Sequence, residues 1–193
     1  MTGARAAFID RDGVLNEGVP DPETGLLESP LHPDEVRLLP GVGPALGRLA
    51  AAGYLLVGVS NQPAAAKGKV TVEELIATQE RVLELLGAEG VRFDDFKLCL
   101  HHPAGIVEGL SGPCDCRKPA PGMLLEAAAE SSIDLSKSWM VGDTDSDIEA
   151  GRNAGVETVL VEYRGSSHKR SGDAQPSFQS IDLQGAVATI LNG

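Results

Sequence analysis

Residues 8–15 read Phe-Ile-Asp-Arg-Asp-Gly-Val-Leu, and this stretch decides how the rest of the chain is interpreted. The apolar run from Ala6 to Ile9 is typical of a buried parallel strand, and it ends at two acids, Asp10 and Asp12. In open α/β sheets, chemistry takes place just beyond the carboxyl ends of the strands. Two carboxylates there can hold a hard cation such as Mg²⁺ and leave one oxygen free to react. A strand followed by a simple Asp-Gly turn explains the same fragment, so the remaining sequence has to decide.

Composition restricts the class of protein. The chain has 193 residues, with 16 basic and 28 acidic side chains and a formal net charge of -12. We expect a single domain, residues 1–193, that acts as a monomer. The acidic balance argues against nucleic acid or an anionic membrane as a partner, whereas a metal and a few local cations still allow a small phosphate substrate. Because we find no signal peptide and no long apolar run, we expect a soluble, cytoplasmic protein.

Apolar runs alternate with helical periodicities, which predicts an α/β fold with a doubly wound, mainly parallel sheet. Thr71 followed three residues later by Glu74 is a capping box that opens one of the helices. We expect a long loop with a short hairpin over 13–40, a mobile segment over 165–177, and no inserted cap domain. The predicted strands are 6–10, 54–59, 96–100, 139–141 and 158–161, and the predicted helices are 43–52, 72–86, 122–131, 145–154 and 181–191.

Three predicted strands end at reactive or hydrogen-bonding residues. The first ends at Asp10, the second at Ser60 and Asn61, and the fourth at Asp143. Lys118 lies in the loop after the third strand. Because the carboxyl ends of parallel strands meet at one edge of a sheet, we expect these residues to lie close together.

This set of residues meets the needs of phosphoryl transfer, in which negative charge on three oxygens calls for cations and donors. Asp10 would attack phosphorus, and Asp12 would protonate the leaving alkoxide and then activate water. Asp143, Asp10 and a backbone carbonyl near Asp12 would hold Mg²⁺. Ser60 would donate to a phosphoryl oxygen, and Lys118 would neutralise charge.

Four ordered motifs resemble those of the haloacid dehalogenase superfamily, over roughly residues 6–162. The resemblance implies that Asp10 is the nucleophile, Asp12 the general acid and base, and the last motif the Mg²⁺ site. It also implies that the second and third motifs bind phosphate or substrate. For Asp147 we keep two interpretations: it supports the metal shell, or it is an exposed acid in the first turn of a helix. The motifs are Asp10-Arg11-Asp12-Gly13, Ser60-Asn61-Gln62, Arg117-Lys118-Pro119, and Gly142-Asp143 with Asp147.

All three cysteines lie between residues 99 and 116, together with an interleaved histidine. Cys99, His101, Cys114 and Cys116 form a donor set typical of tetrahedral Zn²⁺, which would order this loop. His102 is an alternative ligand to His101. Without zinc, Cys99 would be an ordinary strand residue and the other two cysteines would be free thiols.

The loop sequence is similar to that of the D-glycero-D-manno-heptose 1,7-bisphosphate 7-phosphatases, a capless group with a zinc-ordered loop. The resemblance implies Mg²⁺-dependent hydrolysis of the sugar 7-phosphate through an aspartyl-phosphate. It also implies that Arg117 contacts a phosphate, although a solvated loop cation is the alternative. The chain departs from the group at residues 63–66 and at Thr144, where a lysine is common.

Parts of the sequence also fit other functions. Histidinol-phosphate phosphatases share the zinc loop, usually with a shorter insert than 102–113, so histidinol phosphate or another small phosphomonoester is the alternative substrate. A non-catalytic, zinc-ordered binding domain would be expected to lack at least one of Asp10, Asp12, Lys118 and Asp143, and all four are present. The net charge of -12 disfavours a nucleic-acid 3′-phosphatase.

Overall fold

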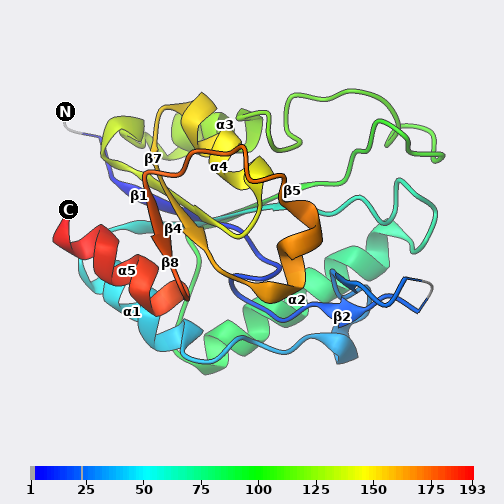
Figure 1. Ribbon diagram of the computed structural model, residues 1–193, viewed down its shortest axis with the longest axis horizontal. Helices are drawn as coiled ribbons and strands as arrows, with labels where there is room; N and C mark the ends of the chain where they lie inside the picture. The colour runs from blue at the N-terminus through cyan, green and yellow to red at the C-terminus, as the bar shows by residue number, and fades with distance from the viewer. Residues whose placement is uncertain (1–2, 23) are drawn as a thin grey trace.

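Six parallel strands form the central sheet of the computed structural model, which describes residues 3–22 and 24–193 (Figure 1). The strand order is β5-β4-β1-β6-β7-β8, so β1 lies in the interior with β4 and β6 as neighbours. The doubly wound, mainly parallel α/β fold is therefore confirmed. The strands are β1 (Ala6–Ile9), β4 (Leu55–Asn61), β5 (Asp95–Cys99), β6 (Trp139–Gly142), β7 (Glu157–Val161) and β8 (Phe178–Ser180).

Helices cover both faces of the sheet, as Figure 1 shows. Alternate residues of β1 reach opposite sides, since Ile9 packs into one hydrophobic core and Phe8 into the other. Both side chains are fully buried, which explains why this strand is apolar at every position rather than alternating. One face carries α1 (Val42–Ala51), α2 (Val72–Ala88) and α5 (Leu183–Asn192), and the other carries α3 (Gly122–Ser131) and α4 (Asp145–Ala154).

The direction of winding reverses beside β1. The chain passes from β1 to β4 and β5 on one side, then crosses back to β6, β7 and β8 on the other. The carboxyl ends of β1 and β6 meet at this switch point, where the backbone N–H of Asp10 donates to the carbonyl of Val141 at 2.9 Å. In open α/β sheets this crevice is where ligands bind.

The structure differs from the sequence-based prediction outside the main elements. The expected hairpin in the long first loop is present as β2 (Val19–Pro20) and β3 (Leu27–Glu28). Strand β8 was not predicted, because it has three residues and two of them are exposed. The segment 165–177, expected to be mobile, instead contributes most of a 3-10 helix, η3 (Arg164–Lys169), and hydrogen-bonds to the site described below. Two further 3-10 turns are η1 (Pro33–Glu35) and η2 (Leu135–Lys137).

Over residues 3–22 and 24–193, no helix is both long enough and apolar enough to span a membrane.

Candidate active site

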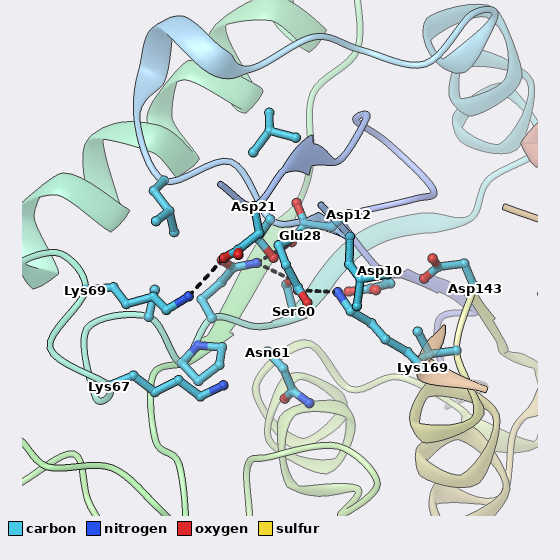
Figure 2. Close-up of a pocket in the computed structure, with 18 of the residues that line it drawn as sticks. Asp10, Asp12, Asp21, Glu28, Ser60, Asn61, Lys67, Lys69, Asp143 and Lys169 are labelled. Carbon is cyan, nitrogen blue, oxygen red and sulfur yellow. Dashed lines mark hydrogen bonds and ion pairs between the residues drawn. The ribbon is translucent and has the colours of Figure 1, made fainter. Parts of the chain in front are cut away.

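A cavity of about 580 Å³ opens at the carboxyl ends of β1, β4 and β6. The hairpin β2–β3 and the helix η3 border it, and Figure 2 shows the acids on its floor. The structure thus brings together residues that are far apart in the sequence, with 137 positions between Asp10 and Asp147. The predicted residues that line it are Asp10, Asp12, Ser60, Asn61, Gln62, Arg117, Lys118, Asp143 and Asp147.

Three carboxylates crowd the floor of the cavity. Asp10, Asp143 and Asp147 each place an oxygen within 4.8 Å of the others, and all three are buried. Burial, together with the charge of Asp147, raises the pKa of Asp10 to about 6, although Lys118 opposes the shift. Burial and the charges of Asp10 and Asp147 raise the pKa of Asp143 well above its ordinary value. Such mutual repulsion indicates a site that calls for additional positive charge.

These carboxylates fit a hard divalent cation. Oδ1 of Asp143 is buried and has no hydrogen-bond partner among the described residues, although buried polar atoms nearly always find one. Carboxylate oxygens are the ligands that Mg²⁺ prefers. Asp12 was also named with the Mg²⁺ site, but its carboxylate is not in this cluster. The contribution of a backbone carbonyl near Asp12 stays a prediction.

Lys118 supplies the buried positive charge. Its Nζ lies 2.8 Å from Oδ1 of Asp10, 2.5 Å from Oδ1 of Asp147 and 2.7 Å from the carbonyl of Val59. Asn61 fixes the backbone of Lys118 from both sides, since its amide donates to the carbonyl at 3.0 Å and accepts from the N–H at 3.1 Å. Asn61 therefore has a positioning contact in the structure, and its predicted contact with substrate stays a prediction.

Asp12 is held by donors on both carboxylate oxygens. Oδ1 accepts from Arg11 at 3.0 Å and from Asn16 at 2.9 Å. Oδ2 accepts from Ser29 at 2.7 Å and from Gln62 at 2.6 Å. Burial alone would raise the pKa of Asp12, but the Arg11 guanidinium and these hydrogen bonds hold it below its ordinary value.

Ser60 is ready to donate a hydrogen bond. It is buried at the end of β4, and its Oγ accepts from Nε2 of Gln62 at 2.9 Å. Because a hydroxyl also carries a proton of its own, the Ser60 O–H can donate into the cavity. Gln62 links Ser60 to Asp12 and in this way couples two of the predicted functional residues.

The structure rules out one of the two interpretations of Asp147, and its support of the metal shell stays a prediction. Its side chain is 1% exposed, so the interpretation as an exposed acid of the first helical turn is wrong. The hydroxyl of Thr144, the N-cap of α4, donates to Oδ2 of Asp147 at 2.6 Å, and the Thr144 N–H donates to the same atom at 3.0 Å. The acid is buried because the turn folds back over it.

Two glycines make room for these acids. A Cβ on Gly13 would lie 2.1 Å from Oδ2 of Asp143, and φ there is +82°, a region that favours glycine. A Cβ on Gly142 would lie 2.1 Å from the Cβ of Asp147. The glycine in each motif is therefore explained by the close approach of a carboxylate.

The four predicted zinc ligands also come together. The Sγ atoms of Cys99 and Cys116 are 3.1 Å apart, those of Cys99 and Cys114 3.7 Å, and those of Cys114 and Cys116 3.4 Å. Nδ1 of His101 lies 3.5 Å from Sγ of Cys116. Tetrahedral Zn–S bonds of about 2.3 Å place sulfur atoms just under 4 Å apart, so the donor set fits zinc. His102 instead accepts from the N–H of Ala104 at 3.1 Å and lies outside the cluster.

Three residues at the site were not predicted from the sequence. Asn16 and Ser29, which donate to Asp12, lie in a loop without a recognisable pattern, and Lys169, which lines the pocket, lies in the segment expected to be mobile. No periodicity or spacing marks these residues, because their partners are brought by the fold. Arg117, by contrast, lines the pocket as expected and donates to the His101 carbonyl at 3.3 Å.

The fold and the four motifs at its strand ends define a class of protein, and comparisons with known proteins agree. A family model described as HAD-hydrolase-like matches residues 115–184. The chain belongs to the haloacid dehalogenase-like hydrolases. Among curated relatives, it is 36% identical over 151 residues to the D-glycero-beta-D-manno-heptose-1,7-bisphosphate 7-phosphatase of Rhodopseudomonas palustris. The matched region covers 78% of this chain and 79% of that relative.

Solved structures give the same result. The D,D-heptose 1,7-bisphosphate phosphatase of B. bronchiseptica, complexed with magnesium and phosphate, superposes with a TM-score of 0.80 at 29% identity, covering 97% of this chain and 98% of that one. The corresponding enzyme of Burkholderia thailandensis superposes with a TM-score of 0.68 at 25% identity, covering 98% and 99%.

Proposed function

We propose that this chain is an Mg²⁺-dependent phosphatase that hydrolyses the 7-phosphate of D-glycero-D-manno-heptose 1,7-bisphosphate. The observation that carries the proposal is the convergence of Asp10, Asp12, Ser60, Lys118 and Asp143 in one cavity. The curated relatives of the same name, at about 36% identity over most of the chain, favour this substrate over histidinol phosphate.

The geometry supports a double-displacement reaction. Asp10 attacks phosphorus and forms an aspartyl-phosphate while the sugar hydroxyl leaves. Asp12, which neighbours Asp10 at the switch point, protonates the leaving oxygen and afterwards takes a proton from the water that cleaves the intermediate. Asp12 must carry a proton when the first step begins, and it regains one from the water in the second step. Its lowered pKa favours the second step, in which the ionised carboxylate accepts that proton. Ser60 donates to a phosphoryl oxygen, and Lys118 offsets negative charge next to the nucleophile.

Asp10 and Asp143, with the backbone carbonyl near Asp12, are the groups proposed to hold Mg²⁺, and Asp147 supports them through Lys118. When bound, the ion supplies positive charge that offsets repulsion between the phosphate and the carboxylates. Cys99, His101, Cys114 and Cys116 are proposed to hold a structural Zn²⁺.

A substrate panel tests the proposal. We would measure kcat/KM for both anomers of the heptose bisphosphate, fructose 1,6-bisphosphate and histidinol phosphate, with Mg²⁺ present. We expect one heptose anomer to exceed every other substrate by about tenfold or more, the difference that 1.4 kcal/mol of transition-state binding makes. A preference for histidinol phosphate would overturn the choice of substrate.

The expectations that the enzyme is a monomer and acts in the cytoplasm stay predictions. Analytical ultracentrifugation of the full chain and cell fractionation would test them.

A further inference from the structure

Lys169, the last residue of η3, reaches into the active-site cavity from the side opposite Lys67 and Lys69 (Figure 2). Its Nζ lies 2.7 Å from Oε2 of Glu28 on the hairpin β2–β3, and its side chain is 36% exposed. The mechanism above gives this lysine no role.

The backbone that carries Lys169 is anchored to the catalytic edge of the sheet. Oγ of Ser166 and Nε of Arg170 both donate to the backbone carbonyl of Asp143, at 3.1 Å and 2.6 Å. At the next residue, Oγ of Ser171 donates to the carboxylate of Asp145 at 2.7 Å. These contacts on both sides of Lys169 fix the backbone that carries it relative to the acids, and its side chain lines the cavity.

Glu28 can release Lys169 without losing all of its partners. Nε2 of His168 donates to Oε1 of Glu28 at 3.3 Å, on the oxygen that Lys169 does not use. Exposed lysine–carboxylate pairs contribute little to stability, so an incoming anion competes for Lys169 at small cost. An ammonium group forms stronger charge-assisted bonds with a phosphate, which offers more charge and more acceptor oxygens than one carboxylate.

The remaining groups on this wall of the cavity are already committed. Lys118 is held between Asp10 and Asp147. Thr144, which follows Asp143, is neutral, and its hydroxyl bonds to Asp147. Neither group is therefore free to neutralise a second anion bound beside Asp143, and η3 provides a cation, Lys169, that lines the same cavity.

We propose that Lys169 leaves Glu28 to bind the second phosphate of the substrate, the one that is not hydrolysed. This inference rests on the proposed function, because it requires a substrate with two phosphates. It makes Lys169 a residue that determines specificity for bisphosphates over monophosphates.

The test compares Lys169→Met with Lys69→Met. Lys69 is a matched control, since it also lines the cavity and pairs with a carboxylate, at 3.2 Å from Asp21, and is 49% exposed. For each variant we would measure kcat/KM for the heptose bisphosphate and for glucose 6-phosphate, and take the ratio of the two values. We expect Lys169→Met to lower this ratio by about 10- to 100-fold, the effect of one charge-assisted hydrogen bond. Lys69→Met should change it less than about threefold, as is usual for an exposed site.

The outcomes separate the two proposals. If the parent enzyme does not prefer the heptose bisphosphate, the proposed function fails on its own evidence. If the parent shows the preference, the inference about Lys169 is overturned by an unchanged ratio in Lys169→Met, or by an equal fall in Lys69→Met. Lys169→Arg should recover most of the ratio, because it restores the charge, and a misfolded variant is recognised by its altered thermal unfolding.

Discussion

The acid cluster at the sheet edge and the cysteine loop are both candidate metal sites, but they are built in opposite ways. Asp10, Asp143 and Asp147 are buried at the ends of β1 and β6 and in the first turn of α4, and Lys118 ties two of them together. In the loop over 100–116, the described residues form neither a strand of the sheet nor a helix, and Ile106 there is 79% exposed. The fold therefore shapes the first site before any ion binds, whereas we expect the second to depend on the proposed zinc for its order.

The largest expected effect comes from the nucleophile. Asp10→Asn keeps the shape of the side chain but removes the attacking oxygen anion, so phosphate release should fall about 1,000-fold or more. The fold should persist, because a neutral amide relieves repulsion from Asp143 and Asp147. Phosphate release and the midpoint of thermal unfolding are the measurements.

Asp21→Asn is the control for this change. Asp21 is an acid that lines the same cavity but lies on the hairpin, away from the acid cluster. We expect its kcat to stay within about threefold of the parent, because Asp21 is not one of the reacting groups. Comparable turnover in Asp10→Asn and Asp21→Asn would remove Asp10 as the nucleophile.

Lys118→Met tests whether the acid site is held together by its buried cation. The change leaves Asp10 and Asp147 buried without their shared partner, and breaking a buried ionic contact from one side costs about 3–5 kcal/mol. Chemical denaturation should show this loss of unfolding free energy. Lys97→Met, which breaks ion pairs on the edge strand β5 with Asp95 and the exposed Glu126 and Glu130, should cost about 1 kcal/mol or less. An equal loss of unfolding free energy in the two variants would mean that Lys118 does not hold the acid site together.

The cysteine loop should respond to its metal instead. Metal analysis of the purified protein should find about one zinc per chain, and Cys116→Ser should abolish it. At free zinc 100- to 1,000-fold above the dissociation constant, the loss corresponds to about 3–4 kcal/mol of unfolding free energy. Limited proteolysis should then cut within 102–113, while the fragments keep the sheet. Protein that is free of zinc yet equally resistant to protease would contradict the loop's dependence on metal.

The contrast between the acid cluster and the cysteine loop also explains which site residues could be predicted from the sequence. Asp10 and Asp143 follow short apolar runs, and parallel strands force such positions to one edge, so their convergence was predictable. The cysteine cluster was predictable because its four ligands lie within one short stretch of chain. The donors to Asp12 from Asn16 and Ser29, and the approach of Lys169, were not, because irregular segments leave no periodic pattern. Strand β8 was missed for a related reason: its residues are mostly exposed and contribute little to the apolar pattern.

The smallest predicted effect separates local stability from function at two matched helix starts. Thr144 caps α4 at the acid site, and Thr71 caps α2 away from it, each with an acid three residues later. Replacing either with valine keeps the shape but removes the hydroxyl, and each change should cost about 1 kcal/mol of unfolding free energy. Only Thr144→Val should also lower kcat, by about three- to tenfold, because Asp147 loses a 2.6 Å donor and no longer holds Lys118 in place. Thermal unfolding and phosphate release on the same preparations would check both parts, and an equal fall in kcat for Thr71→Val would show that helix stability, not the position of Asp147, limits the reaction.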